Sequence, residues 1–515
     1  MRRTFPLLLA LLSVASAQAP APIIDVGNAR YQGTVNAATN ISSYLGIRYA
    51  TAPVGDLRFR APQSPPVLDG VQQATTQPQQ CLQAGSGNSP TNPNPTSSLS
   101  SRATQDPEDC LFLKYVPVHF LNTTVRPDVR YYISGGAGSF NGGDLISEAK
   151  NGVVKANGAL NAGLREYKLV SYAPNPIADL MGRISKFGGD PDRVTIWGQS
   201  AGAGSVLQHV IARNGMTSPP LFRAAISSSS FLPSQQPFDG AVPEVRHKCD
   251  GSANALSCLR AANVSILQAA NVNVNRAGFF GTFVAVPVVD GEFITQRPTQ
   301  ALRQRRVNGR ALLAVTNTHE GNSFVNQSTA ATVRAADYAL RLFPNIGVAN
   351  AATVAGLYAG VGAPIDQANA IMGESIFICP TYYMLNAFPG TSFKSSHSSG
   401  PPAFNNPTFI TAFSGAFMDF ATTLDPNRKI DSTNITPQWS SHLIGNAEML
   451  FNRTMGGQPD IRAITTSSTL LQRCAFWETV SRSPLSKIAH KMMICLRQPL
   501  APIDSVSRHK HFRTA

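Results

Sequence analysis

Residues 198–202 read Gly-Gln-Ser-Ala-Gly and fit the pattern G-x-S-x-G, which is typical of a nucleophilic serine. In this pattern Ser200 stands on a sharp turn between a strand and a helix, and the flanking glycines leave room for the close strand–helix approach. The chemistry would be two-step acyl transfer, in which Ser200 attacks a carbonyl and water then cleaves the acyl-enzyme. The alternative is a Gly-rich turn with a capping serine.

The residues on either side of the pattern favour the catalytic interpretation. Val194–Trp197 has the character of a buried strand. Beyond Ser200, apolar residues recur at helical spacing through Val206, Leu207 and Val210. A strand, the turn and a helix therefore follow one another in the order that the pattern requires.

A nucleophilic serine also needs backbone N–H donors for the developing oxyanion. We expect Ala201 to supply one donor, because it directly follows the nucleophile. Gly135 and Gly136 are candidates for the others, since they follow a predicted strand at Val129–Ile133. Without the serine motif, this glycine loop would be only a flexible turn.

An acid that orients the general base should follow the serine in the chain. Glu320 is the candidate, because it comes just after a predicted strand at Leu312–Thr316. The alternative for this glutamate is a solvated surface residue.

The elements that must hold these residues indicate an α/β fold. Short apolar runs, which include Ala224–Ser227, are separated by longer segments, and this predicts a large, mostly parallel sheet flanked by helices. The stretch from Leu342 to Leu424 is rich in helix formers, whereas Gln77–Asp109 is expected to be an exposed loop.

The N-terminus is typical of a secretory signal. Two arginines precede a short apolar stretch, and Ala15-Ser16-Ala17 is a small-residue cleavage site, so residues 1–17 are predicted to be removed. We expect one domain over residues 18–480 and a basic tail of unknown role over 481–515. No apolar run reaches the length of about 18 residues that a membrane span needs. N-glycosylation sequons begin at Asn40, Asn122, Asn263, Asn326, Asn434 and Asn452.

The seven cysteines fit an oxidising compartment. Cys81 and Cys110 flank a polar loop, as do Cys249 and Cys258, so each pair is predicted to form a local disulfide. Of the other three, at positions 379, 474 and 495, any two could pair. No C-x-x-C pair indicates a metal or redox site.

The net charge of +14 raises the question of a nucleic-acid partner. The tail beyond Ser481 contributes +6 and the leader +2, which leaves +6 for the body. Because the body shows no basic stripe interleaved with aromatic residues, we expect solvated surface charge and no nucleic-acid partner.

Several blocks of the sequence together resemble the type-B carboxylesterases and lipases, the cholinesterase-like branch of the α/β-hydrolases, and especially their secreted fungal members. The resemblance runs from about residue 24 to about residue 480. The blocks that carry it are Tyr44–Ala50, Glu108–Leu111, Phe187–Pro191 leading into Gly198–Gly202, Pro287–Gly291 and His319–Gly321.

This resemblance implies Ser200 as nucleophile, Glu320 as acid, the two local disulfides, and no metal or cofactor. It also implies a secreted, extracellular carboxylic ester hydrolase that acts on small-molecule esters. The alternative is a non-catalytic, cholinesterase-like binding protein with an incomplete triad.

The sequence departs from the family at three places. The oxyanion loop reads Ser-Gly-Gly-Ala at 134–137 where the family has His-Gly-Gly-Gly, and after Val154 a strand and loop of the family are missing or altered. The general base is the third departure. His397 lies in the right region, but it lacks the acidic and aromatic residues that should follow it, and Phe404 comes only seven residues later. We predict that His397 is a displaced base, or that the site has no base.

Overall fold

A computed structural model describes the chain over most of its length. The described residues are 19–60, 62–78, 81–90, 108–116, 123–130, 146, 149, 153–159, 183–235, 249, 254–284, 286–388, 390–398 and 404–481. Within them no helix is long and apolar enough to cross a membrane.

A sheet of 13 strands forms the centre of the described molecule, in the order β1-β2-β3-β5-β7-β6-β8-β9-β10-β11-β12-β13 with β4 beside β2. The strands are β1 (Ala19–Asp25), β2 (Arg30–Asn36), β3 (Ile41–Arg48), β4 (Val71–Gln73), β5 (Phe112–Val116), β6 (Thr123–Arg130), β7 (Val153–Ala159), β8 (Gly189–Gln199), β9 (Ala224–Ser228), β10 (Ala311–Asn317), β11 (Ser392–His397), β12 (Ala447–Arg453) and β13 (Pro459–Thr465).

The middle of this sheet is parallel from β7 through β6 and β8 to β12. The carboxyl ends of parallel strands meet at one edge, which is where ligands bind in open α/β sheets. Every residue of β10 up to Thr316 is buried, as expected for a parallel strand covered on both faces. The parallel sheet thus fixes the edge at which a site can form.

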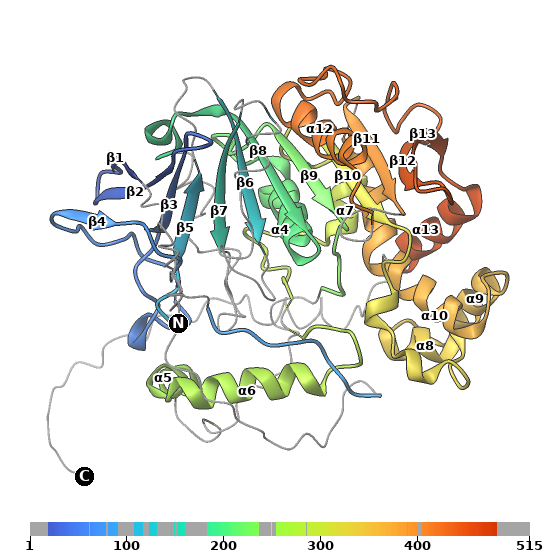
Figure 1. The fold of residues 1–515 in the computed structure, drawn as a ribbon. Coiled ribbons are helices and arrows are strands. Elements are labelled where there is room, and N and C mark those ends of the chain that lie inside the picture. The colour runs from blue at the N-terminus through green and yellow to red at the C-terminus, as the bar shows by residue number, and fades with distance from the viewer. Residues whose placement is uncertain are drawn as a thin grey trace, which may run out of the picture.

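Helices cover both faces of this parallel region. Their bounds are α4 (Ala201–Ile211), α5 (Ala255–Ala261), α6 (Val264–Ala277), α7 (Pro298–Arg303), α8 (Ala335–Leu342), α9 (Val348–Tyr358), α10 (Pro364–Gly373), α11 (Cys379–Ala387), α12 (Pro407–Thr423) and α13 (Ser468–Val480). Side chains of α4 and α11 pack in one apolar cluster, and those of α12 pack in the other. Figure 1 shows α8, α9 and α10 grouped beside the C-terminal part of the sheet.

The predicted fold class is confirmed. The expected strands at Val194–Trp197, Ala224–Ser227 and Leu312–Thr316 lie within β8, β9 and β10. The strand expected at Val129–Ile133 instead begins at Thr123 and is described only to Arg130. The segment at Val154, after which a family strand was expected to be missing or altered, itself forms strand β7, which pairs with both β5 and β6.

Both predicted local disulfides are present. Cys81 is joined to Cys110 and Cys249 to Cys258. The first bridge joins Cys81 to Cys110, which lies two residues before the start of β5.

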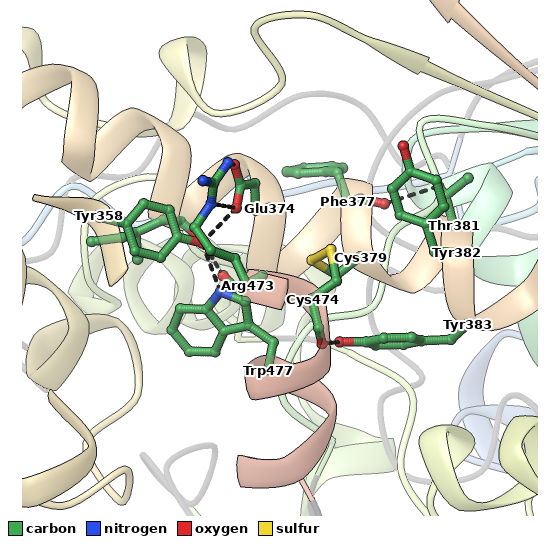
Figure 2. Close-up of a disulfide and its surroundings, with 12 residues drawn as sticks. Tyr358, Glu374, Phe377, Cys379, Thr381, Tyr382, Tyr383, Arg473, Cys474 and Trp477 are labelled. Carbon is green, nitrogen blue, oxygen red and sulfur yellow. Dashed lines mark hydrogen bonds and ion pairs between the residues drawn. A yellow bond between two sulfur atoms is a disulfide. The ribbon is translucent and has the colours of Figure 1, made fainter. Parts of the chain in front are cut away.

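A third disulfide joins Cys379, the first residue of α11, to Cys474 in the middle of α13 (Figure 2). The hydroxyl of Tyr383 on α11 also donates to the carbonyl of Cys474 at 2.7 Å. Of the three cysteines left open by the sequence, these two therefore pair, and Cys495 lies outside the described residues.

A buried polar network lies beside this disulfide (Figure 2). The guanidinium of Arg473 on α13 donates two hydrogen bonds of 2.7 Å to the carboxylate of Glu374. The hydroxyl of Tyr358 donates to the same carboxylate at 2.7 Å and accepts from the indole N–H of Trp477 at 2.8 Å. Each of these groups has a partner, so α13 is held to the helices before it by polar as well as covalent links.

We predict that Arg473→Met destabilises the protein by about 3 kcal/mol, because it leaves the buried Glu374 carboxylate without its cation. The side chains of Arg473 and Glu374 are only 15% and 7% exposed. Arg462→Met is the matched control, since Arg462 is 59% exposed and pairs with Asp460 at the surface. The control should lose about 1 kcal/mol or less. Denaturant unfolding followed by circular dichroism measures both, and equal losses would contradict the prediction.

Candidate active site

Ser200 stands between the last residue of β8 and the first residue of α4, with φ 56° and ψ −125°. A positive φ is unfavourable for any residue with a Cβ and persists only where the surroundings enforce it. The backbone N–H of Ser200 donates to the carbonyl of Ser228 on β9 at 2.9 Å, and its carbonyl accepts from Gly204 at 2.9 Å. The serine is thus held in the sharp turn that the sequence pattern predicts.

The glycines of the pattern allow this turn. A Cβ on Gly198 would overlap the backbone carbonyl of Gly202, so β8 and α4 meet backbone to backbone. Ala201 is the first residue of α4, where backbone N–H groups have no partner within the helix and carry partial positive charge. The other two predicted oxyanion donors, Gly135 and Gly136, lie outside the described residues.

Glu320 lies in the turn after β10, two strands from β8. Its carboxylate accepts from the backbone N–H of Asn317 at 2.7 Å and from the side-chain amide of Asn317 at 3.2 Å. The Asn317 amide also donates to the hydroxyl of Ser229 at 3.0 Å. A Cβ on the next residue, Gly321, would overlap the carbonyl of Asn369 on α10, so the turn is packed tightly against that helix.

Burial raises the pKa of the Glu320 carboxyl above its usual range. Hydrogen bonds from Asn317 and Ser229 oppose this shift, and so does the positive charge of Lys394. Ionising Glu320 therefore costs free energy in the folded protein, despite three groups that favour the anion.

His397 is the last residue of β11 and pairs in parallel register with Asn317 of β10. Its Nδ1 lies 3.2 Å from the side-chain oxygen of Asn317, and its ring lies 5.1 Å from that of Phe413 on α12. Asn317 therefore stands between Glu320 and His397 and contacts both. The predicted acid and the predicted base therefore share one neighbour, Asn317, whose side-chain amide links them.

His397 and Ser200 stand at the ends of different parallel strands of the sheet. The strands β8 and β11 are three positions apart in the sheet, which corresponds to a backbone separation of about 14 Å. A general base must lie within about 3 Å of the proton that it accepts, directly or through one water. The sheet register fixes His397 on a strand, so its position at the sheet edge is set by its pairing with Asn317.

The other described histidines lie elsewhere. His209 is buried at the far end of α4, about 13 Å along the helix axis from Ser200, and burial lowers its pKa to about 4. His442 is buried against Tyr382, and burial lowers its pKa as well. His319 is exposed beside the acid. The remaining histidines of the sequence, at positions 119, 247, 490, 509 and 511, lie outside the described residues.

A buried ion pair next to Glu320 was not predicted from the sequence. The ammonium of Lys394 on β11 is fully buried and lies 3.3 Å from the Glu448 carboxylate of β12. It also donates to the hydroxyl of Thr316 on β10 at 2.8 Å, one residue before Asn317. Burial raises the pKa of Glu448, but Lys394 and neighbouring hydroxyl groups outweigh burial and bring it to about 2. The only trace of this ion pair in the sequence is the lysine at position 394 in a short stretch of alternating residues. A lysine on the exposed face of a strand would give the same pattern, so the sequence could not indicate that Lys394 is buried.

Comparisons with known proteins agree with this fold. The model of the Carboxylesterase family matches residues 20–152 and 180–350, and the chain belongs to this family. Among its relatives, Lipase 2 of Diutina rugosa is 27% identical over 86% of this chain and 94% of its own length. Secreted lipase 1 of Botryotinia fuckeliana (strain B05.10) is 24% identical over 82% and 88%. Neuroligin-2 of Mus musculus is 28% identical over 60% of this chain and 42% of its own.

A solved structure titled as Aspergillus niger EstA superposes with a TM-score of 0.75, at 23% identity, and covers 90% of this chain and 98% of its own. This likeness supports the α/β-hydrolase fold. The family match places the chain among the carboxylic ester hydrolases.

We predict that Glu320→Gln stabilises the protein at neutral pH. Because burial raises the folded-state pKa of Glu320, the wild type loses stability as the pH rises from the unfolded-state pKa through the folded-state pKa. Glutamine carries no charge and avoids this loss, so the gain should be absent below about pH 4 and complete above the folded-state pKa.

Chemical unfolding of the wild type and the variant between pH 4 and pH 8 measures this difference. Glu292→Gln, which removes one negative charge at an exposed carboxylate, is the control for the change in net charge. A variant that is destabilised equally at every pH would contradict the prediction.

Proposed function

We propose that the chain is a secreted hydrolase of small-molecule carboxylic esters, with Ser200 as nucleophile and Glu320 as the acid of the site. The observation that carries the proposal is the strained backbone of Ser200 at the carboxyl edge of the parallel sheet. Such strain is typical of functional sites, and it orients the hydroxyl away from the strand. Glu320, two strands away, is held at the same edge.

In the proposed mechanism Ser200 attacks the ester carbonyl while a general base takes the proton of its hydroxyl, and the same base returns that proton to the alcohol as it leaves. The N–H groups of Ala201, Gly135 and Gly136 stabilise the oxyanion, and each donor is worth about 3–4 kcal/mol of barrier. Water then attacks the acyl-serine, which releases the acid and restores the hydroxyl. Glu320 would stabilise the cation that forms when the base takes the proton.

Secretion is supported by three features. The described chain contains three disulfides, which persist in oxidising compartments. The sequons at Asn40 and Asn263 are exposed and could carry glycans, but Asn434 is buried and its amide donates to Asp419 at 3.2 Å. Secreted lipase 1 is a relative whose name states secretion.

A second candidate function is a non-catalytic binding protein on the same scaffold. Two observations favour it: the separation of about 14 Å between the backbones of His397 and Ser200, and the similarity to Neuroligin-2, whose name is not that of a hydrolase. The acylation of Ser200 separates the two candidates.

We predict that the purified protein hydrolyses short aryl acetates and that Ser200→Ala abolishes the activity, because no other hydroxyl stands at the elbow between β8 and α4. Stopped-flow release of the aryl alcohol and labelling by an organophosphonate ester measure the reactive hydroxyl. Ser205→Ala, one helical turn further along α4, is the control and should retain activity. Equal hydrolysis with and without the Ser200 hydroxyl would show that the assignment is wrong.

His397→Ala should leave the rate of Ser200 acylation within a few-fold of the wild-type rate, because β11 and β8 are three strand positions apart, which separates their backbones by about 14 Å. A true general base contributes about two to four orders of magnitude. The same pre-steady-state assay applies. A fall of that size would show that His397 reaches Ser200 in solution and is the base. An unchanged rate that is already slow in the wild type supports the binding protein.

A further inference from the structure

The arginines of the body are concentrated in two segments of the chain. Residues 211–223 and 297–310 together contain seven arginines and no aspartate or glutamate. The first segment follows α4 and leads into β9, and the second runs from α7 to β10. Both therefore connect helices back to the amino ends of parallel strands.

The structure packs the two segments against each other. The side chain of Asn308 donates to the carbonyls of His209 and Ala212 at 3.0 and 2.9 Å and accepts from the N–H of Thr217 at 3.0 Å. The N–H of Arg310 donates to the carbonyl of Arg223 at 2.7 Å. A Cβ on Gly215 would overlap the backbone of the second segment. The two segments thus form one fixed surface.

Five guanidinium groups point outward from this surface, which we call the arginine face. Its members are Arg213, Arg303, Arg305, Arg306 and Arg310, and all five are exposed. The other two arginines of the segments have partners, since Arg223 donates to carbonyls at the end of α12 and Arg297 donates to the carbonyl of Ser481.

None of the five forms an ion pair within the part of the chain that the structure describes. Two acidic residues, Asp290 and Glu292, shortly precede Phe293, whose carbonyl accepts from the Arg213 N–H. The carboxylate of Asp290 already accepts from the N–H groups of its own turn. The positive charge of the face is therefore left to solvent or to a partner.

The arginine face lies at the opposite edge of the sheet from the candidate site. Arg310 directly precedes β10, whereas Glu320 follows it, and the seven residues of the strand span about 23 Å. If a flat anionic surface bound the arginine face, the site of Ser200 would lie on the side of the protein that points away from that surface. The face is thus suited to anchoring and not to delivering an ester from that surface.

We propose that the arginine face binds an extracellular acidic polysaccharide through its carboxylate or sulfate groups. Guanidinium groups bind such planar or tripodal oxyanions with paired hydrogen bonds, and the face contains arginine and no lysine. Tethering there would leave the carboxyl edge of the sheet open to soluble esters. Binding does not require Ser200 to be active, although the choice of a polysaccharide rests on the proposed secretion.

Other anionic partners fit this surface less well. Met216, 66% exposed, is the one large apolar side chain that is strongly exposed in the two segments, so there is little to insert into a lipid surface. Phe222, the one aromatic residue of the segments, is buried, and exposed rings for stacking nucleic-acid bases are absent from these described residues.

The basic tail begins next to the face. The hydroxyl of Ser481 donates to that of Thr299 in the first turn of α7 at 3.1 Å, and the sequence continues with seven Lys or Arg and one Asp. The tail could itself bind polyanions, so the experiment must use the full chain and change only the face.

Binding of the full secreted chain to polygalacturonate and to heparin is measured at about 50 and 200 mM salt, where electrostatic binding differs most. The test variant is Arg305→Gln with Arg306→Gln. The control is Arg334→Gln with Arg428→Gln, two exposed arginines outside the face. We expect the wild type and the control to bind with equal affinity, and both to bind more weakly at the higher salt concentration. At each salt concentration the test variant should bind about 10- to 30-fold more weakly than the wild type.

Two results would overturn the proposal. Equal binding by the test variant and the control would assign polyanion binding to the tail or to general charge. Failure of the wild type to bind either polysaccharide, together with face-dependent binding to phosphatidylserine vesicles or to single-stranded DNA, would assign the face to a different partner. Far-ultraviolet circular dichroism confirms folding, and ester hydrolysis, measured separately, keeps a failure of the proposed function distinct from a failure of binding.

Discussion

The contact between the backbones of β8 and α4 determines where everything else in the candidate site must lie. Gly198 lies against the carbonyl of Gly202, and no side chain fits between them. The chain must therefore reverse within one residue, and Ser200 adopts a positive φ that costs about 1–3 kcal/mol. Burial of every residue of α4 offsets that cost and prevents the turn from relaxing.

The ionisation of Glu320 depends on a second constraint, which is the buried ion pair between Lys394 on β11 and Glu448 on β12. Lys394 and Glu448 form an ion pair without access to water, and such pairs persist only where every remaining polar atom has a partner. Lys394 meets this condition partly through Thr316, next to the residue that holds Glu320. The ion pair thus lies directly behind the acid and favours its anionic form, although burial of Glu320 prevails.

Much of this arrangement could be predicted from the sequence. The glycines around Ser200 and the apolar runs of β8, β9 and β10 are local signals, and the structure confirms those strands. The short spacing of the first two cysteine pairs was equally informative. Strand β11 was not predicted, because its sequence, Ser-Phe-Lys-Ser-Ser-His, has polar residues at positions that are buried. Hydrophobic periodicity cannot detect a strand whose interior is filled by an ion pair.

Because strand β11 could not be predicted, the position of His397 at the end of that strand could not be predicted either. A histidine in a loop can reach across a sheet, whereas one on a strand is fixed by register, and His397 is in register with Asn317. Its imidazole contacts the residue that binds Glu320, so the link between acid and histidine is retained through an amide. An amide cannot accept the positive charge that a general base acquires, nor does it shorten the distance to Ser200. The strained serine and the half-buried acid both lower stability, and neither is needed to fill the core. Their presence at one edge of the sheet is therefore evidence for function at that edge, whether the function is turnover or binding.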